Sequence, residues 1–527
     1  MRRRRHLYTR VIAAAGLTCA TLFGYARSAQ AWDPTSIHIP LTERAALDSD
    51  LQVRWMDASD AAFGLFSGVR LDPSLLSTDE RVLIFETLTN LPSSAGARPL
   101  GGPGACPPPG SPEQTQRYCV EGDLWELDAL GRLRFGVLAE SSPPDRVSQH
   151  FFFPSHDLES ETSAPRLHDS LPQRTQRRLR TAGTSRFIGL NPTRQRASAR
   201  AWYENQDGVL SPAQFSRHLE LAATSPTNRE RQHHLAMALI CAGALGHVLQ
   251  DLAVPAHARG DVDAFFQQLS ELPGDRGLPL QEWSRVHIGK PGIYAIQSED
   301  QEMGPPLPLR ALFFHPTRGT AAVTRALHFS ENTLPSSKVL SPALAPDMAA
   351  RELLEDSDID PTMRERATLT RWPADSGYVK LSDGRALFAW RRDANGVVTP
   401  FLDEQVYRSE TEMLLPRALS ATTQAFDWLF PAWPSADTTI ERGILSFQLP
   451  EELREAHVLV AVQDKLGRRG PSQRIALSQR GPQRLVGLPI PTDAHSTSVT
   501  FIGDRPDGTH FVASRVFRSD VAASNEP

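Results

Sequence analysis

The chain has few cysteines and, beyond its N-terminus, no segment that we expect to cross a bilayer. Its 527 residues include 4 cysteines, at positions 19, 106, 119 and 241, and no two of them form a Cys-x-x-Cys pair. This excludes a zinc site built from cysteine pairs, so any metal must be held by His, Asp and Glu. No segment after the N-terminal region is apolar enough to cross a bilayer, so we expect a soluble exported protein.

The N-terminus has the features of a secretory signal peptide. Arg2–Arg5 form a basic start, an apolar run extends from Val11 to Phe23, and Ala29-Gln30-Ala31 is a small-x-small cleavage sequence. The apolar run is too short for a stop-transfer helix. We therefore expect cleavage after Ala31, which would leave Trp32 as the mature N-terminus of a secreted or periplasmic protein.

Cleavage would also make the protein more acidic. The first 31 residues hold six of the 56 basic residues and none of the 61 acidic ones, which leaves a formal charge of −11. Such a charge disfavours non-specific binding to nucleic acid, although a local basic groove stays open. In an oxidising compartment Cys106 and Cys119 are expected to pair across a Pro/Gly-rich loop, and Cys241 is expected to be a buried thiol.

The patterning predicts a mainly α fold in two domains after the signal peptide (1–31). Helical patterns dominate 32–434, where Val379 to Trp390 form a strand, an Asp-Gly turn and a strand, which predicts a small inserted β-hairpin. Short alternating runs separated by turns then predict a C-terminal antiparallel β-sandwich over 435–518, followed by a flexible tail, 519–527. Six helices are expected: 41–51, 78–91, 212–223, 229–252, 320–327 and 405–429.

The most specific pattern lies at the end of the long apolar helix. His247 and Asp251 are four residues apart, so their side chains lie on one face of the helix. An imidazole and a carboxylate at that spacing can hold one metal ion or share two. Pro255 is expected to end the helix, and His257 to return from the turn as a further ligand. A structural hydrogen bond at a helix end is the alternative explanation of this pair.

Other histidines and acids lie before and after this helix in the sequence. Trp32 is followed by His38, and Glu140-Ser141 precedes His150-Phe151-Phe152-Phe153-Pro154. Farther on come Phe329-Ser330-Glu331-Asn332-Thr333 and Leu414-Leu415-Pro416-Arg417-Ala418. With these motifs, residues 32–430 resemble the bacterial zinc-dependent phospholipase C family, which shares a helical fold and a trinuclear zinc site with single-strand-specific nucleases.

The resemblance implies a ligand set. Trp32, through its free amine and carbonyl oxygen, would hold one zinc with His38 and Asp251. His150, His247, the bridging Asp251 and an acid upstream of His150 would hold a second. His257, with a later histidine and an acid, would hold the third.

The sequence departs from the family pattern at two places. The acid upstream of His150 is usually the Asp of a Glu-Asp pair, where this chain has Glu140-Ser141, so Glu140 is the substitute ligand. No His-x-x-x-Glu follows His257, and the acids that remain for the third zinc are Asp261, Asp263 and Glu282. Individually these three acids are more typical of a surface, with one of them expected to face the site. A carboxylate-rich site should bind zinc more weakly.

The implied chemistry is hydrolysis of a phosphodiester. Zinc ions that share the Asp251 carboxylate lower the pKa of a water toward ~7, and Glu140 is a candidate to orient it. The expected substrates are phospholipid head groups, reached by transient contact with a membrane surface.

Two other functions stay open. One is cleavage of single-stranded nucleic acid, which the acidic charge disfavours. The other is a degenerate relative that binds without catalysis, with the partner of the β-sandwich unknown. His150 could be a core histidine, and His233 and His234, roughly 20 Å along the helix from His247, are expected to face solvent.

Overall fold

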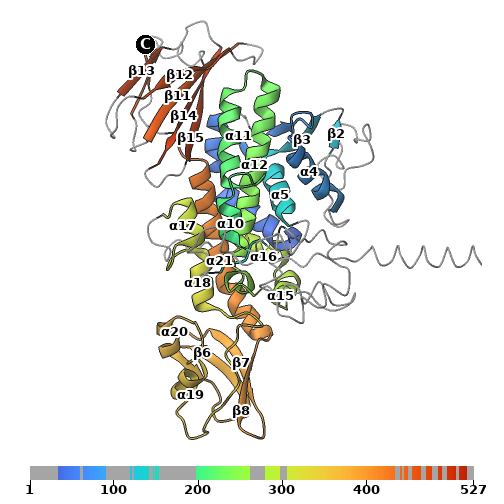
Figure 1. The fold of residues 1–527 in the computed structure, drawn as a ribbon, viewed down its shortest axis with the longest axis vertical. Coiled ribbons are helices and arrows are strands. Elements are labelled where there is room, and N and C mark those ends of the chain that lie inside the picture. Colours follow the sequence, from blue (N-terminus) through green and yellow to red (C-terminus); the bar gives the residue numbers. More distant parts are fainter. Residues whose placement is uncertain are drawn as a thin grey trace, which may run out of the picture.

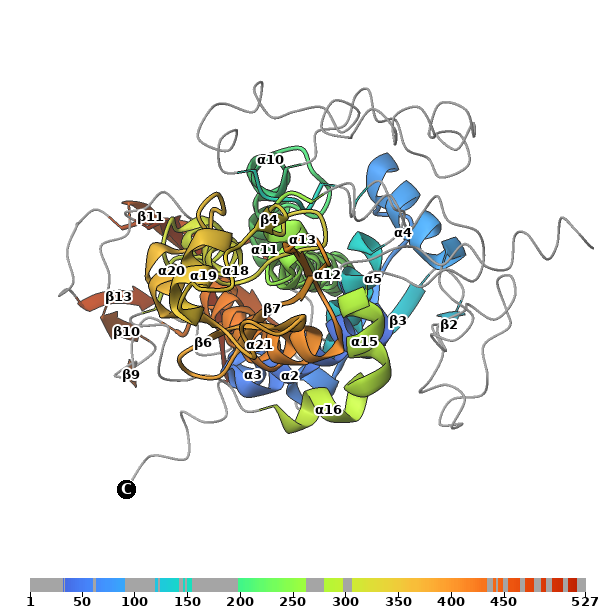
Figure 2. The same ribbon diagram turned by 90° about the horizontal axis from the view of Figure 1, so that it is seen from below.

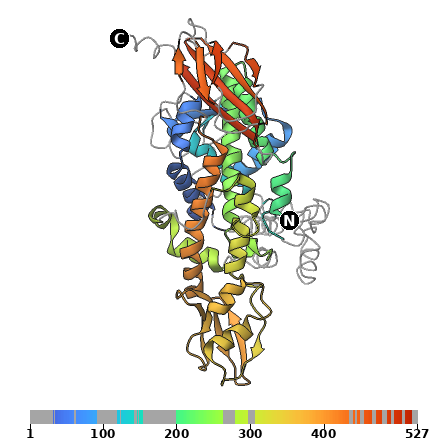
Figure 3. The ribbon, with the colours of Figure 1, turned by 90° about the vertical axis from the view of Figure 1, so that its left-hand side faces the viewer.

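The computed structural model describes residues 32, 34–59, 63–90, 119–121, 124–141, 146, 149–153, 198–261, 279–296, 306–433, 439–441, 444–448, 454–464, 470–477, 485–489, 495–505 and 510–518. The signal peptide, Cys106, Asp263, the Arg-rich segment 174–197 and the C-terminal tail lie outside them. The described parts stack into an elongated molecule with helices in the middle and β-sheets at both ends (Figures 1 and 3).

The centre of the helical part is α12 (Asn228–Asp251), which begins with a capping box. Thr227 Oγ1 accepts a hydrogen bond from the Glu230 amide, and Glu230 Oε2 accepts one from the Thr227 amide. From Leu235 to Asp251 every residue is buried, because α12 is surrounded by α5 (Ala129–Glu140), α11 (Pro212–Thr224), α2 (Ile39–Asp48) and α21 (Glu404–Leu429) (Figure 2). Among the described residues, α12 is the helix long and apolar enough to cross a membrane, and 89% of its apolar window is buried in the protein.

Two glycines let α5 and α12 approach closely. A Cβ on Gly136 would lie 2.0 Å from the Ile240 carbonyl oxygen, and one on Gly243 would lie 2.0 Å from the Leu133 carbonyl oxygen. Only a residue without a side chain fits at such distances. This contact holds the C-terminal end of α5, with Glu140 and Ser141, close to the C-terminal half of α12.

Shorter elements complete the helical part. β1 (Gly68–Leu71), β3 (Leu124–Asp128) and β2 (Cys119–Glu121) form a small antiparallel sheet in the order β1-β3-β2. The remaining helices are η1 (Pro34–His38), α3 (Leu51–Ser59), η2 (Gly64–Phe66), α4 (Thr78–Asn90), α10 (Ala199–Glu204), α13 (Pro255–Ala258), α15 (Pro279–His287), α16 (Gly289–Ala295), α17 (Leu309–Phe314) and α18 (Thr320–Leu327). One apolar core runs through the helical part, from Trp32 to Phe430.

The predicted hairpin is the centre of a larger sheet. β6 (Ser376–Leu381) and β7 (Ala386–Arg392) pair antiparallel across the Asp383-Gly384 turn, as predicted. They lie in a five-stranded sheet with β5 (Ala367–Leu369), β8 (Val397–Phe401) and β4 (Lys338–Val339), covered by α19 (Pro346–Leu353) and α20 (Pro361–Arg366). This part has its own apolar core around Phe388 and Trp390. The predicted two-stranded hairpin therefore underestimated this sheet, because its edge strands are too short to give a periodic signal in the sequence.

The C-terminal part contains two antiparallel sheets. β12 (Gln473–Ala476), β11 (Arg454–Gln463), β14 (Ser496–Asp504) and β15 (His510–Arg518) form one, and β13 (Leu485–Pro489), β10 (Ile444–Gln448) and β9 (Thr439–Glu441) form the other. The central strands β11 and β14 of the four-stranded sheet are buried on both faces. Val458 and Phe501 belong to the sheet's own core, whereas Leu459, Ile502 and Val512 pack against Ala223 of α11. The antiparallel β character predicted for this region is confirmed.

Two local predictions were wrong. α12 ends at Asp251, within a residue of its expected end, but Pro255 does not end it: Pro255 begins the short helix α13, which carries His257 where a turn was expected. The fixed φ of proline suits the first turn of a helix, where no amide donor is needed. His233, expected to face solvent, is 1% exposed, because β1 and the residue after it cover that side of α12.

Candidate metal centre

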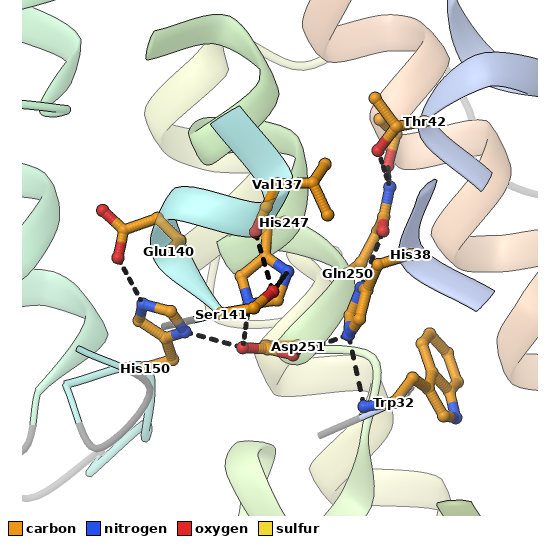
Figure 4. A network of polar contacts seen from close by, with 11 residues as sticks. Trp32, His38, Thr42, Val137, Glu140, Ser141, His150, His247, Gln250 and Asp251 are labelled. Carbon is orange, nitrogen blue, oxygen red and sulfur yellow. Dashed lines mark hydrogen bonds and ion pairs between the residues drawn. The ribbon is translucent and has the colours of Figure 1, made fainter. Parts of the chain in front are cut away.

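Asp251, the last residue of α12, is fully buried and is approached by three histidines. His38 Nε2 lies 3.2 Å from Asp251 Oδ1. His247 Nε2 and His150 Nδ1 lie 3.2 Å and 2.6 Å from Oδ2 (Figure 4). His38 ends η1, His150 lies in the segment that precedes α10, and His247 is one turn before Asp251. Three of the residues predicted to bind zinc therefore converge on the carboxylate of a fourth, Asp251.

The orientation of His38 is fixed from outside this cluster. The amide nitrogen of Gln250 donates to the Thr42 and Thr422 hydroxyls, at 3.0 Å and 3.3 Å. The Gln250 oxygen must then accept from His38 Nδ1, at 2.8 Å. This assignment leaves the lone pair of a neutral His38 on Nε2, the nitrogen that faces Asp251.

His247 is oriented in the same way by α5. The Ser141 hydroxyl donates to the Val137 carbonyl oxygen at 2.7 Å, so its oxygen can accept from His247 Nδ1, at 3.5 Å. Burial lowers the pKa of His247 to about 4. The attraction of the Asp251 carboxylate acts in the opposite direction but is outweighed. The side chain is therefore neutral at pH 7, with the lone pair of Nε2 facing Asp251.

The backbone nitrogen of Trp32 reaches the same place. It lies 3.2 Å from His38 Nε2, and the Trp32 side chain is fully buried. The predicted cleavage after Ala31 would convert this nitrogen into a free amine beside the cluster. Residues 1–31 lie outside the described part, and the cleavage stays a prediction.

His150 connects Asp251 to Glu140. While its Nδ1 faces Asp251, its Nε2 lies 3.2 Å from Glu140 Oε2, and the Trp202 indole donates to Glu140 Oε1 at 3.1 Å. Burial opposes the charged form of His150, but the bonds to Asp251 and Glu140 outweigh it and raise the pKa of His150 to about 9. Burial also opposes ionisation of Glu140, but the proximity of His150 outweighs it and lowers the pKa of Glu140.

This arrangement fits a metal ion. The ligand atoms of His38, His247 and Asp251 all lie within 4.8 Å of one another. Two ligand atoms on one tetrahedral zinc are about 3.3 Å apart, close to the observed imidazole–carboxylate distances. His247 Nε2 and Asp251 Oδ1 are fully buried and take part in no hydrogen bond, which is costly unless another partner compensates. An ion between these atoms would satisfy them.

The residues predicted for a third zinc are placed differently. The His257 ring is fully buried and stacks on Phe151 with a centroid distance of 4.2 Å. Burial lowers the pKa of His257 to about 4, although the negative charge of Asp251 acts to raise it, so the ring is neutral at pH 7. Asp261, 6% exposed, accepts hydrogen bonds from the Ser330 hydroxyl, the Asn332 amide and the Asn332 side chain. Asp261 thus holds the 329–333 loop, while the Glu282 side chain, like Asp263, lies outside the described part.

Three residues that serve the cluster were not predicted from the sequence. These are Gln250, Ser141 and Trp202, which orient His38, His247 and Glu140. Gln250 is next to Asp251 and three residues after His247, so its helix position was a signal that could have been used. Ser141 and Trp202 belong to other segments, and only the packing of α5 and α10 brings them to the site.

Two solved structures are similar to this chain at a low level. The alpha-toxin of Clostridium absonum has 10% sequence identity and a TM-score of 0.27 over 92% of this chain and 93% of that chain. The alpha-toxin of an avian strain of Clostridium perfringens has 10% identity and a TM-score of 0.26 over 92% and 98%. No protein-family model and no curated protein sequence matches the chain. The function is therefore inferred from the geometry of the site.

Proposed function

We propose that the protein is an exported, zinc-dependent hydrolase of phosphodiesters, similar to phospholipase C and active on phospholipid head groups. One observation carries the proposal: both oxygens of the buried Asp251 carboxylate face imidazole nitrogens from three separate segments. A carboxylate surrounded in this way suits two ions that share it. Activity would require brief contact with a membrane surface, and the C-terminal sheets have no assigned partner.

The residues divide into two ligand groups around Asp251. His38 and the amine and carbonyl oxygen of Trp32 would hold one zinc with Asp251 Oδ1. His247 and His150 would hold the other with Asp251 Oδ2. Zinc in such a site supplies an acidified water, with a pKa near ~7, and polarises a phosphate oxygen. His257, with Asp263 or Glu282, stays the proposed place of a third ion.

Glu140 acts through His150 in this proposal. Its two oxygens already face His150 Nε2 and the Trp202 indole nitrogen. A carboxylate that accepts from a ligand histidine fixes the ring and increases its basicity. We therefore assign Glu140 as a positioning residue and Asp251 as the shared ligand on which activity depends.

The test uses protein expressed with its leader and secreted, so that the N-terminus is made by cleavage. Zinc per chain and hydrolysis of phosphatidylcholine vesicles are measured for wild type, Asp251→Asn and the surface control Asp347→Asn. We expect at least two zinc ions per wild-type chain. Asp251→Asn, but not the control, should lose hydrolysis and the zinc held by the cluster around Asp251. Full activity of Asp251→Asn would overturn the proposal.

Substrate class is decided in the same assay. Zinc-dependent cleavage of single-stranded DNA without cleavage of phosphatidylcholine would replace the phospholipase by a nuclease. Zinc binding without turnover on either substrate would indicate a binding protein that keeps a metal site.

A further inference from the structure

A second group of histidines lies near the other end of α12. His218 of α11 and His233 and His234 of α12 gather there with Glu80 of α4. At 1.5 Å per residue, His234 is about 20 Å along α12 from His247. These residues therefore form a cluster separate from the one around Asp251.

His218 and His234 face each other through matching atoms. Their Nδ1 atoms are 3.2 Å apart, with ring centroids 5.5 Å apart and planes at 33°. Two imidazole nitrogens bound to one tetrahedral zinc are separated by about 3.3 Å. The same separation also suits an N–H···N hydrogen bond, so the surroundings of the two rings must distinguish these possibilities.

Glu80 fixes the orientation of His218. Glu80 Oε1 lies 3.0 Å from His218 Nε2, and Oε2 accepts from the Ser77 amide at 2.7 Å. Burial opposes ionisation of Glu80, but the hydrogen bonds from His218 and the Ser77 amide outweigh it and lower its pKa to about 2. The Glu80 carboxylate, at this distance, favours the His218 tautomer with its proton on Nε2, which leaves the lone pair of a neutral His218 on Nδ1, facing His234. Ligand histidines in metal sites are oriented by carboxylates in the same way.

His233 adds a buried nitrogen with no hydrogen bond. Its Nδ1 accepts from the Asp72 amide at 3.3 Å, so its proton is on Nε2, which has no hydrogen-bond partner although His233 is 1% exposed. The His233 and His234 ring centroids are 5.0 Å apart.

We propose that His218 Nδ1 and His234 Nδ1 bind a zinc ion that is separate from the catalytic cluster, with Glu80 as the positioning residue. Water would complete the coordination. Such an ion would join α11 to α12. Because α11 packs through Ala223 against Leu459, Ile502 and Val512, the ion would stabilise the surface on which the C-terminal sheet lies.

The test is a Zn²⁺ and Co²⁺ titration of the full-length chain carrying Asp251→Asn, in which the first cluster has lost its shared carboxylate. His218→Asn, His234→Asn and Glu80→Gln are each added to it. His287→Asn is the control, because His287 is exposed on α15 and its contacts with other described residues are with Trp283 of its own helix, by a hydrogen bond to the carbonyl oxygen and by ring stacking.

We expect His218→Asn and His234→Asn each to lose one bound ion, and Glu80→Gln to bind it 10- to 100-fold more weakly. The control should bind as the parent does, and His234→Asn alone should leave hydrolysis unchanged. Binding by His234→Asn equal to that of the parent would overturn the proposal and leave a simple hydrogen bond. If that variant fails to fold, unchanged affinity in Glu80→Gln overturns it equally.

Discussion

His38 and Asp251 meet at a distance of 3.2 Å inside the protein, one from the N-terminal η1 segment and the other from the end of α12. Neither residue has access to solvent. The two can meet only when α2 and α21 are packed against α12, so the metal centre exists only in the folded chain. Metal affinity should therefore be part of the folding free energy.

Gln250 should control zinc affinity without binding zinc. Gln250→Leu removes the acceptor that holds His38 Nδ1 and should weaken zinc binding by about 10- to 100-fold. Thr422→Val, which removes only one acceptor of the Gln250 amide, is the matched control and should have a smaller effect. A chelator competition titration measures both variants, and equal affinity of Gln250→Leu and wild type would contradict the assigned role.

Gly243 should be intolerant of any side chain. In Gly243→Ala the new Cβ would lie 2.0 Å from the Leu133 carbonyl oxygen, so α5 and α12 must separate, at a cost of about 1–3 kcal/mol. Gly246→Ala on the same helix meets its nearest atom, Thr422 Cγ2, at 3.3 Å and should change stability by under about 1 kcal/mol. Urea unfolding measures both. Equal stability of the two variants would show that the helices have room to adjust.

The zinc-free protein should lose stability as pH rises toward 9. Because the folded pKa of His150 is raised to about 9 from 6.5, its protonated form stabilises the fold fully below pH 6.5. That contribution falls as pH rises from 6.5 through about 9. Over the same range zinc binding should strengthen, since the ion competes with this proton. Thermal unfolding of chelated wild type and His150→Asn from pH 6 to 9.5 checks the sign: the variant should lack this decline.

Glu410 should be a source of instability at neutral pH. It is 2% exposed in α21, and neither of its oxygens has a hydrogen bond. Burial, and then the charge of Glu331, raise the pKa of Glu410 well above its ordinary value. The destabilisation of the fold by this buried carboxyl therefore grows as pH rises above about 4.5.

Glu410→Met should consequently raise the melting temperature at pH 8, with a difference that shrinks toward pH 4.5. The exposed Glu412→Met on the same helix is the control and should show no such trend. A lower melting temperature for Glu410→Met at pH 8 would show that the carboxyl has a stabilising partner when folded.

The helices that carry the site followed from local patterns. The apolar stretch before Asp251 and the Ser211-Pro212 start of α11 have clear periodicity and caps, and the structure has these helices within a residue or two of the expected bounds. α5 was missed, although it carries Glu140. It is half the length of α12 and contains Gly131 and Gly136, which lower the helix propensity of so short a segment.

The sequence by itself determined the residue types and the local spacing: His247 one turn before Asp251, Trp32 shortly before His38, and no cysteine pairs to bind a metal. Tertiary structure decided which of these residues meet. It brought His38 and His150 to the two oxygens of Asp251 and committed Asp261 to the 329–333 loop. It also buried His233 beside β1 and placed His234 against His218 of α11. Spacing specifies neighbours only within one helix, whereas contacts between segments depend on close approaches such as that of Gly136 and Gly243.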